Sequence, residues 1–369
     1  MRKKKILCCV GTRPEAIKMA PVILALKKEP WAHVCVLATA QHRHMLDQVL
    51  DFFGIEPDID LNIMRPHQAL TVLTARLLLE LDDVLQAEKP DVVLAQGDTS
   101  TVMTVALASF YHGIPFGHVE AGLRTGDMRN PFPEEANRVI AGRLARWHFA
   151  PTETARQNLL REGVNDSEIV ITGNTVIDAL LMTAAKEIKT GIVLDDTKRL
   201  VLVTAHRREN FGERFRNVCC ALKILSDRNP DIQILYPVHP NPNVKDIAHE
   251  MLGETWGIIL CEPLDYAAFI AAMKKAHLII TDSGGVQEEA PALGKPVLVL
   301  RNETERPEAV EAGVVKLVGT DLDRIVSETQ RLLDDVVAYR SMARGVSPYG
   351  DGHAAGRIVN VLRGHLGTN

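Results

Sequence analysis

Residues 276–290 of the chain read AHLIITDSGGVQEEA, an apolar run followed by two adjacent glycines and a helix-forming segment. The pattern predicts a buried strand that ends at Thr281, a tight turn at Gly284 and Gly285, and then a helix. Backbone N–H groups and the positive dipole end at such a helix start form a site for phosphate. Glu289, on the first turns of the helix, can accept hydrogen bonds from ribose hydroxyls. The stretch therefore indicates an α/β fold that binds a nucleotide diphosphate, with a sugar nucleotide favoured.

Short apolar runs alternate with longer amphipathic segments along almost the whole chain. This alternation predicts parallel sheets with helices on both faces, so the expected fold class is α/β, built from Rossmann-like, doubly wound sheets. The expected helices include 15–28, 69–86, 101–111, 133–144 and 265–275. The expected strands are 5–10, 34–38, 92–95, 116–119, 147–150, 169–171, 200–203, 232–238, 258–260, 278–281, 297–300 and 315–318.

The length of 369 residues favours two domains over one. The alternation restarts after a helical and then polar stretch, which places an N-terminal domain at 1–174 and a C-terminal, nucleotide-binding domain at 175–351. A helix in the tail, 352–369, is expected to pack back on the first domain. Two doubly wound domains are expected to face a central cleft, with ligands bound at the carboxyl ends of the strands.

Composition excludes several classes of partner. The formal net charge of -5 gives no reason to expect nucleic acid or an anionic membrane surface as a partner. The basic start, 1–5, is followed by an apolar run too short for a signal peptide, and no run of about 18 apolar residues predicts a spanning helix. A cytoplasmic protein without a membrane partner is expected. The six cysteines show no CxxC spacing, so they are expected to be buried, reduced thiols.

Charged residues follow several of the expected strands in the first half of the chain. Arg13 and Lys18 lie in and just after the turn at Gly11, where they can reach an anion; solvated surface residues are the alternative. Asp98 follows the strand 92–95, where it is either a ligand-site carboxylate or a helix N-cap.

Two further carboxylates, Glu120 and Glu134, extend this acidic group. Glu120 follows the strand 116–119, and Glu134 starts a helix after Pro133, where it could serve only the helix dipole. The sharper hypothesis is that Asp98, Glu120 and Glu134 converge in one cleft as acid/base groups.

Basic side chains follow the strands of the second half. His206 and Arg207 come directly after the strand 200–203, and His239 ends the next strand. Arg306 follows the strand after the glycine turn, where it either binds phosphate or lies in a solvated loop. Metal binding by these histidines is possible, but no HExxH or paired-carboxylate frame supports it, so no metal is expected.

Taken together, these segments resemble the non-hydrolysing UDP-N-acetylglucosamine 2-epimerase family. In chain order they run from Gly11 to Val310 and read GTRPEAIKMAP, GDT, HVEAGLRTGD, PFPEEANR, AHRRENFG, PVHPNP, TDSGGVQEEAP and TERPEAV. Each is weak alone, but the ordered combination is specific, and it covers most of the chain. The resemblance implies two Rossmann-like domains in the GT-B-type arrangement that many glycosyltransferases share.

The resemblance also implies a reaction, the reversible C2 epimerisation of UDP-GlcNAc to UDP-ManNAc, which supplies ManNAc units for bacterial surface polysaccharides. The C2 hydrogen is not acidic, because no carbonyl is attached to C2. Since the chain has no GxGxxG, a bound NAD is not expected, and no cofactor is expected at all. The remaining route eliminates UDP to a 2-acetamidoglucal and adds it back. The implied partners are UDP-GlcNAc, UDP-ManNAc, UDP and a second copy of the chain in a homodimer.

Site residues carried over by resemblance fall into three groups. The catalytic group is Asp98, Glu120, Glu134, His206 and Lys18; the substrate-binding group is Arg13, Phe269, Ser283, Gly284, Gly285, Glu289 and Arg306; the allosteric group is Gln41, Arg207 and His239. Which carboxylate takes the C2 proton and which returns it is not assigned. Three other functions stay open at this point: a glycosyltransferase of the same fold, a hydrolysing epimerase, and a sensor that binds UDP-GlcNAc without turnover.

Overall fold

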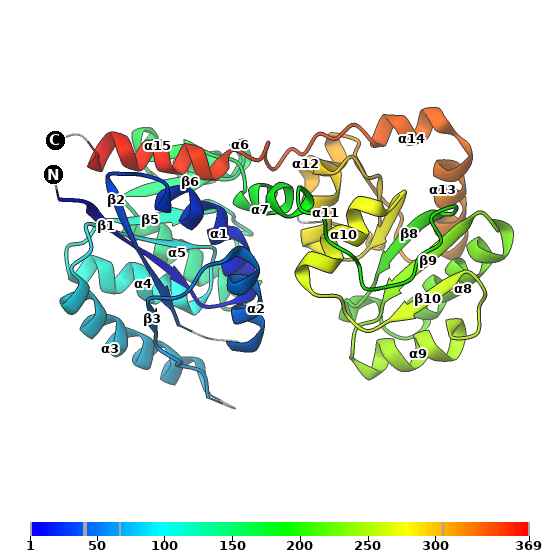
Figure 1. Cartoon of the computed structure of the whole chain (residues 1–369), viewed down its shortest axis with the longest axis horizontal. Helices are drawn as coiled ribbons and strands as arrows, with labels where there is room; N and C mark the ends of the chain where they lie inside the picture. The colour runs from blue at the N-terminus through cyan, green and yellow to red at the C-terminus, as the bar shows by residue number, and fades with distance from the viewer. Residues whose placement is uncertain (1, 40–42, 66–67, 305, 368–369) are drawn as a thin grey trace. The chain divides into compact units, whose positions relative to one another are not determined.

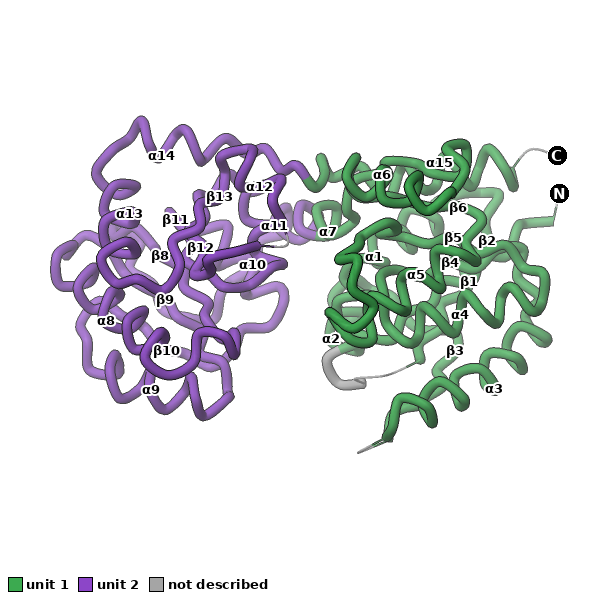
Figure 2. Tube along the Cα trace, turned by 180° about the vertical axis from the view of Figure 1, so that it is seen from behind, with its two compact units in different colours: residues 1–179, 349–369 green, residues 180–348 purple. Residues whose placement is uncertain are grey.

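The computed structural model describes residues 2–39, 43–65, 68–304 and 306–367. Two compact units are distinguished in Figure 2. Unit 1 is Met1–Ala179 with Tyr349–Asn369, and unit 2 is Leu180–Pro348. The chain thus leaves unit 1 after Ala179 and returns to it at Tyr349, whereas the expected boundaries lay after residues 174 and 351.

Unit 1 contains, in its described part, a seven-stranded sheet in the order β3-β2-β1-β4-β5-β6-β7. All neighbouring strands are parallel. The strands are β1 (Lys4–Val10), β2 (Ala32–Ala38), β3 (Ile59–Asp60), β4 (Val92–Gln96), β5 (Phe116–Val119), β6 (Trp147–Ala150) and β7 (Ile169–Ile171). The helices are α1 (Arg13–Lys27), α2 (Arg43–Phe53), α3 (Leu70–Glu88), α4 (Ser100–Tyr111), α5 (Glu134–Leu144), α6 (Glu153–Arg161) and α15 (Ala354–Leu366). A further helix, α7 (Thr175–Ala184), begins in unit 1 and continues into unit 2.

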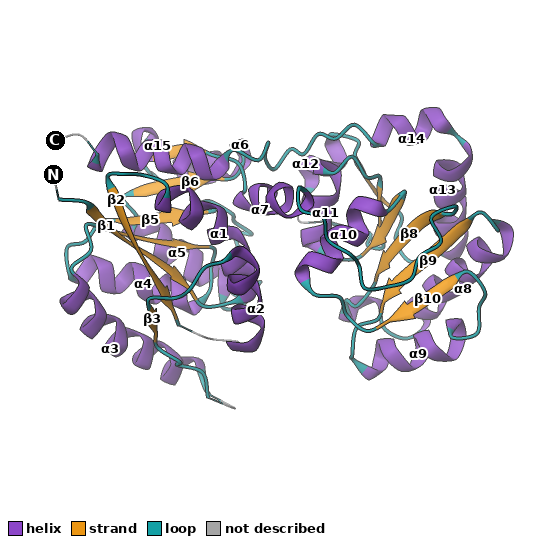
Figure 3. Cartoon of the chain, viewed as in Figure 1, coloured by secondary structure: helices purple, strands orange, loops and turns teal. Residues whose placement is uncertain are grey.

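Helices cover both faces of this sheet, as Figure 3 shows. On one face α3, α4 and α5 pack side by side, and α3 buries a leucine every fourth residue (Leu73, Leu77, Leu81 and Leu85). A spacing of four keeps these side chains on one stripe of the helix. Elsewhere in the unit α15 packs against α1, which itself contacts β1, β2 and β4. The central strands are buried on both faces, and so their sequences read as continuous apolar runs.

Unit 2 repeats the architecture with a six-stranded parallel sheet in the order β10-β9-β8-β11-β12-β13. Its strands are β8 (Arg199–Thr204), β9 (Ile232–Pro237), β10 (Ile258–Cys261), β11 (Leu278–Thr281), β12 (Val297–Val299) and β13 (Val315–Leu317). Its helices are α8 (Glu213–Arg228), α9 (Pro242–Leu252), α10 (Tyr266–Lys275), α11 (Gly284–Ala292), α12 (Pro307–Glu311), α13 (Leu322–Asp334) and α14 (Val336–Met342). Side chains from α8, α9 and α13 form one core with the sheet.

The strand order reverses direction at one place in each sheet, between β1 and β4 in unit 1 and between β8 and β11 in unit 2 (labelled in Figure 2). Figure 1 shows β8, β9 and β10, the strands on one side of this point in unit 2. Ligands of such sheets bind outside the carboxyl ends of the strands at this switch point. The fold class expected from the sequence, doubly wound α/β in two domains, is confirmed. Among the described residues, no helix combines the length and the apolar character that crossing a lipid bilayer requires.

Candidate active site

The turn after β1 carries Arg13 and leads to Lys18. A capping box starts α1: the Thr12 side chain accepts a hydrogen bond from the backbone N–H of Glu15, and the Glu15 carboxylate accepts from the N–H groups of Gly11 (2.5 Å) and Thr12 (3.2 Å). Burial raises the pKa of Glu15 to about 7, although these hydrogen bonds favour its charged form. The cap fixes where α1 begins, so half-buried Arg13 and Lys18 project from defined positions on its first turns.

Lys18 forms an ion pair with Glu120. Its Nζ lies 2.6 Å from Oε1 and 2.7 Å from Oε2 of the carboxylate, and the Glu120 side chain is only 6% exposed. Glu120 follows β5 with a φ of 64°, in the left-handed region that a glutamate rarely adopts. Such strained residues persist where surrounding contacts fix them, and they cluster at functional sites.

Asp98 follows β4 and is separated from it by Gly97, whose φ is 89°. The N-cap of α4 is Thr99, whose side chain accepts from the N–H of Val102. The alternative role of Asp98 as the N-cap of this helix is therefore wrong. Its carboxylate instead accepts a hydrogen bond of 2.6 Å from Nη2 of Arg138 on α5.

The electrostatic environment of Asp98 links it to the other predicted carboxylates. Burial raises its pKa, the charges of Glu120 and Glu134 raise it further, and Arg138 and Lys18 oppose the shift. Unit 1 thus brings Lys18, Asp98, Glu120 and Glu134 within electrostatic reach of one another. A carboxyl group with a raised pKa is suited to proton transfer near neutral pH.

The two glutamates that start α5 have different surroundings. Glu135 is buried, and it accepts hydrogen bonds from the N–H groups of Thr125 (3.1 Å) and Gly126 (3.0 Å). It holds the loop between β5 and α5 in place. Glu134 is half-buried, and its charge helps to raise the pKa of Asp98.

In unit 2 the glycine turn joins β11 to α11. Ser283 is the N-cap residue, and the helix begins at Gly284. A Cβ added at Gly284 would lie 2.9 Å from both Cζ and Nη1 of Arg306, so the guanidinium rests directly on the turn. Nε of Arg306 donates a 2.6 Å hydrogen bond to Glu288 on α11, which orients it. A helix N-terminus and an arginine meet here, next to the exposed Gly285, and together they suit a phosphate group.

The two remaining substrate-binding predictions in unit 2 lie on helices beside β11. Glu289 is half-buried on α11, and its Oε1 would lie 3.7 Å from a Cβ at Gly285, so it runs alongside the turn. Phe269 is half-buried on α10, the helix that leads into β11.

Asp282, directly before the turn, organises the basic residues after β8. Its buried carboxylate accepts hydrogen bonds of 2.8 Å from the backbone N–H groups of both His206 and Arg207, and another of 3.2 Å from the side chain of Asn210. Its Oδ1 lies 3.3 Å from Nδ1 of His206. Burial lowers the pKa of His206, and the Asp282 charge opposes this shift.

Two of the three predicted regulatory residues, Arg207 and His239, lie in the part of the chain that the structure describes. The His239 ring stacks on that of His206, with centroids 5.4 Å apart and planes 13° from parallel. Arg207 is the neighbour of His206, and its charge lowers the pKa of that histidine. Gln41 lies outside the described residues.

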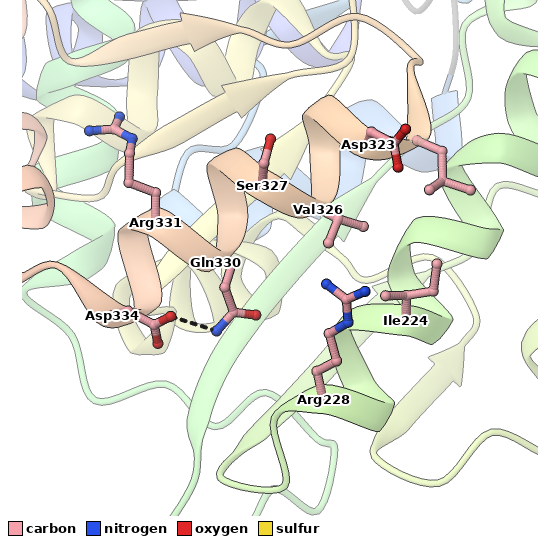
Figure 4. A pocket seen from close by; sticks show the side chains of 9 residues that line it. Ile224, Arg228, Asp323, Val326, Ser327, Gln330, Arg331 and Asp334 are labelled. Carbon is pink, nitrogen blue, oxygen red and sulfur yellow. Dashed lines mark hydrogen bonds between the residues drawn. The ribbon is translucent and has the colours of Figure 1, made fainter.

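Hollows elsewhere in unit 2 do not coincide with these residues. One of about 540 Å³ lies between α8 and α13, where Ile224 and Arg228 of α8 and Val326 and Gln330 of α13 line it (Figure 4). A larger one of about 950 Å³ lies between the segment 183–194 and α10. Neither is lined by a predicted site residue. Within the described ranges, no group of three or more His, Cys, Asp and Glu side chains is arranged to hold a metal ion.

Comparison with known proteins identifies the family. The model of a family described as UDP-N-acetylglucosamine 2-epimerase matches residues 24–363. The chain belongs to this epimerase family. A UDP-N-acetylglucosamine 2-epimerase of Escherichia coli K12 is 55% identical over 369 residues, which are 97% of this chain and 98% of that protein.

Solved structures of epimerases superpose on the whole chain. The enzyme of Neisseria meningitidis bound to UDP-GlcNAc has a TM-score of 0.86 at 47% identity, covering 97% of this chain and 99% of the other. That of Methanocaldococcus jannaschii, in complex with UDP-GlcNAc and UDP, has a TM-score of 0.78 at 35% identity with the same coverage.

Several residues that hold the candidate site residues of each unit in place were not predicted as site residues. They are Gln96, Arg138 and Asn174 around the carboxylates of unit 1, and Asp282 and Glu288 around the basic groups of unit 2. Asp282 and Glu288 lie within the glycine-turn motif, and Arg138 ends the PFPEEANR motif, so these motifs could have marked them as site residues. No sequence pattern marks Gln96 or Asn174, because each is a single amide whose partner is distant in sequence.

Proposed function

We propose that this enzyme interconverts UDP-GlcNAc and UDP-ManNAc by inverting the configuration at C2 of the sugar. The observation that carries the proposal is the 55% identity to a UDP-N-acetylglucosamine 2-epimerase over 97% of the chain. The relatives solved with UDP-GlcNAc and with UDP support the same ligands here. A cytoplasmic enzyme that supplies ManNAc units for bacterial surface polysaccharides is the proposed cellular role.

The proposed mechanism is elimination and re-addition of UDP. The bond from C1 to the diphosphate oxygen breaks, its electron pair leaves with UDP, and a carboxylate takes the C2 proton to give 2-acetamidoglucal. A carboxyl group then returns a proton to the other face of C2 while the diphosphate oxygen bonds to C1 again. No net oxidation occurs, so no redox partner is needed.

Each unit is proposed to supply one half of this chemistry. The glycine turn at Ser283–Gly285, with Arg306 against it, binds the diphosphate; Glu289 binds the ribose, and Phe269 lies beside the uracil. The carboxylates Asp98, Glu120 and Glu134 of unit 1 transfer protons at the sugar. Lys18, Arg13 and His206 stabilise the negative charge that develops on the leaving group.

The test is an NMR time course of the purified protein with UDP-GlcNAc, without added NAD or metal. The expected result is a growing UDP-ManNAc signal and, in heavy water, deuterium at C2 of both sugars. Turnover with complete retention of the C2 hydrogen would overturn the elimination mechanism. Release of free ManNAc with UDP would instead identify a hydrolysing enzyme.

Regulation by UDP-GlcNAc is a separate proposal, which rests on Arg207, His239 and Gln41. The contact between the His239 and His206 rings supports it, because a second ligand at His239 would act directly on a catalytic imidazole. The rate should rise sigmoidally with UDP-GlcNAc, and pure UDP-ManNAc should react slowly until a little UDP-GlcNAc is added. His239→Ala should flatten the curve; hyperbolic kinetics of the unmodified enzyme would contradict regulation.

A homodimer is also proposed. Unit 1 exposes large apolar side chains on packed neighbouring helices: Leu79 on α3 (71% exposed), Phe110 and Tyr111 at the end of α4 (61% and 71%) and Ile140 on α5 (40%). Exposed apolar residues on one layer of helices favour an interface between copies. Light scattering of the purified protein should give twice the chain mass, and Leu79→Glu with Phe110→Glu should return it to the monomer mass.

A further inference from the structure

Glu120 is held by donors that come from three separate segments of unit 1. Lys18 on α1 donates to both oxygens, as given above. The side-chain amide of Gln96, the last residue of β4, donates to Oε2, and the amide of Asn174 donates a 2.8 Å hydrogen bond to Oε1. Hydrogen bonds to an ionised carboxylate are stronger than those between neutral groups. This arrangement therefore fixes both the orientation and the charge of the group.

The backbone of Glu120 explains why such fixing is needed. At a φ of 64° the residue is strained, and it returns to an ordinary conformation unless neighbouring contacts prevent it. Gln96 is well placed to prevent this, because it is buried and pairs in register with Val119, the residue before Glu120. The amide thus reaches the carboxylate from the adjacent strand.

Asn174 connects Glu120 to the place where the chain leaves and re-enters unit 1. Its backbone N–H donates to the carbonyl of Tyr349 (2.6 Å), and its Oδ1 accepts from the N–H of Val176 at the start of α7 (3.0 Å). A Cβ added at Gly173 would come within 3.2 Å of Cα of Gly350, so the outgoing and returning segments touch here. The side-chain amide is buried between them, and its nitrogen is directed at Glu120.

We propose that Asn174 and Gln96 are positioning residues of the epimerase reaction, which hold Glu120 as an oriented carboxylate toward C2 of the sugar. The inference rests on the proposed function, in which Glu120 is one of the proton-transferring groups. Neither amide needs to touch the substrate. Their effect is exerted through Glu120, because a carboxylate that rotates away from the C2 proton loses the near-attack geometry on which proton transfer depends.

The test compares substitutions that remove the donor but keep the local structure. Asn174→Asp keeps the size of the side chain and the acceptor that starts α7, but it replaces the N–H donor with an oxygen facing Glu120. Asn174→Ser keeps an oxygen that can accept from the N–H of Val176, but it shortens the side chain and removes the amide that donates to Glu120. Gln96→Met removes the other donor at nearly constant volume. The matched control is Asn158→Asp on α6, because half-buried Asn158 likewise donates its side-chain amide, in this case to the backbone carbonyl of Gly122.

The expected result is a loss of kcat with little change in KM or in the affinity for UDP. We expect kcat to fall about 10²-fold for Asn174→Asp and about 10-fold for Asn174→Ser and Gln96→Met, because a displaced reacting group costs up to about 10²-fold. Deuterium incorporation at C2 should slow by the same factors, whereas Asn158→Asp should remain within about two-fold of the unmodified enzyme.

Two results would overturn the inference. One is a kcat of both Asn174→Ser and Gln96→Met within about two-fold of the unmodified enzyme. The other is a loss that appears only in KM, or only in step with a lowered melting temperature. If the unmodified protein itself produced no UDP-ManNAc, the proposed function would fail instead, which this series distinguishes because the unmodified enzyme is measured in parallel.

Discussion

The two units place an aspartate at the same point of the same fold, but the two residues have different surroundings. Asp98 follows β4, the neighbour of β1, and Asp282 follows β11, the neighbour of β8. The Asp98 side chain is 28% exposed and pairs with Arg138, whereas Asp282 is fully buried and accepts hydrogen bonds from backbone N–H groups. The first has a raised pKa and can exchange protons; the second fixes the loop that carries His206.

This difference extends to the whole of each site. Unit 1 gathers carboxylates around Lys18, and unit 2 gathers arginine, histidine and a helix N-terminus. A doubly wound sheet determines only where a ligand site lies, and the residues of the turns determine its chemistry. The comparison therefore predicts that substitutions of the carboxylates in unit 1 affect turnover, whereas substitutions at the glycine turn of unit 2 affect binding of the nucleotide.

The largest effect is expected from the carboxylates of unit 1. Asp98→Asn, Glu120→Gln and Glu134→Gln should each lower kcat by about 10²–10⁴-fold, the usual cost of losing a general acid or base. UDP affinity, measured by calorimetry, should change little, because the proposed diphosphate site is in unit 2. Glu168→Gln, which removes a surface carboxylate paired with Arg146, is the control. Near-native activity of all three variants would refute the assignment.

The next largest effect is expected at the glycine turn. Arg306→Ala should weaken UDP binding by about 10- to 100-fold, since a hydrogen bond to a charged group contributes about 1.5–3 kcal/mol. Gly284→Ala should act in the same direction, because a methyl group there displaces the guanidinium. Arg216→Ala, which removes an exposed arginine paired with Glu250, is the control. If Arg306→Ala lowered kcat but left UDP affinity intact, the assignment of nucleotide binding to the glycine turn of unit 2 would be wrong.

The sequence predicted the strands of both sheets well, for a physical reason. Central parallel strands are buried on both faces, so their apolar runs stand out from the amphipathic helices, and most expected strands end within a residue or two of the observed ones. β3 was missed because it has only two residues, Ile59–Asp60, too few to form a recognisable pattern.

The site was predictable only where a motif is contiguous. The glycine turn combines two glycines, a helix start and an acid in one stretch, and Asp98 and Glu120 each follow a recognisable strand. The left-handed backbone of Glu120 was not predicted, because the sequence places the residue only directly after the strand 116–119. Asn174 lies 54 positions further along the chain, between β7 and α7. Its contact with Glu120 could not be predicted, because it depends on the tertiary fold and not on any local pattern.

A smaller effect tests whether Asp282 acts through His206. Because its charge opposes the lowering of the His206 pKa by burial, Asp282→Asn should lower that pKa further. NMR titration of the His206 ring measures the shift, with Asp231→Asn, whose partner is Arg199 on the surface, as the control. A pKa that rises or stays constant would show that Asp282 has no electrostatic role at His206.

The smallest expected effect would resolve which proton-transfer role Asp98 has. Arg138 holds the pKa of Asp98 down against burial, so Arg138→Gln should raise that pKa, and the change should be small because solvent reaches both groups. If Asp98 must be ionised to act as the base, the acidic limb of the kcat/KM profile should move to higher pH. If it must be protonated to act as the acid, the alkaline limb should move to higher pH instead. Arg146→Gln removes the same charge at an exposed site and should leave both limbs in place. Two unmoved limbs in Arg138→Gln would mean that the titration of Asp98 does not control the reaction, and the comparison between Asp98 and Asp282 would then lose its functional meaning.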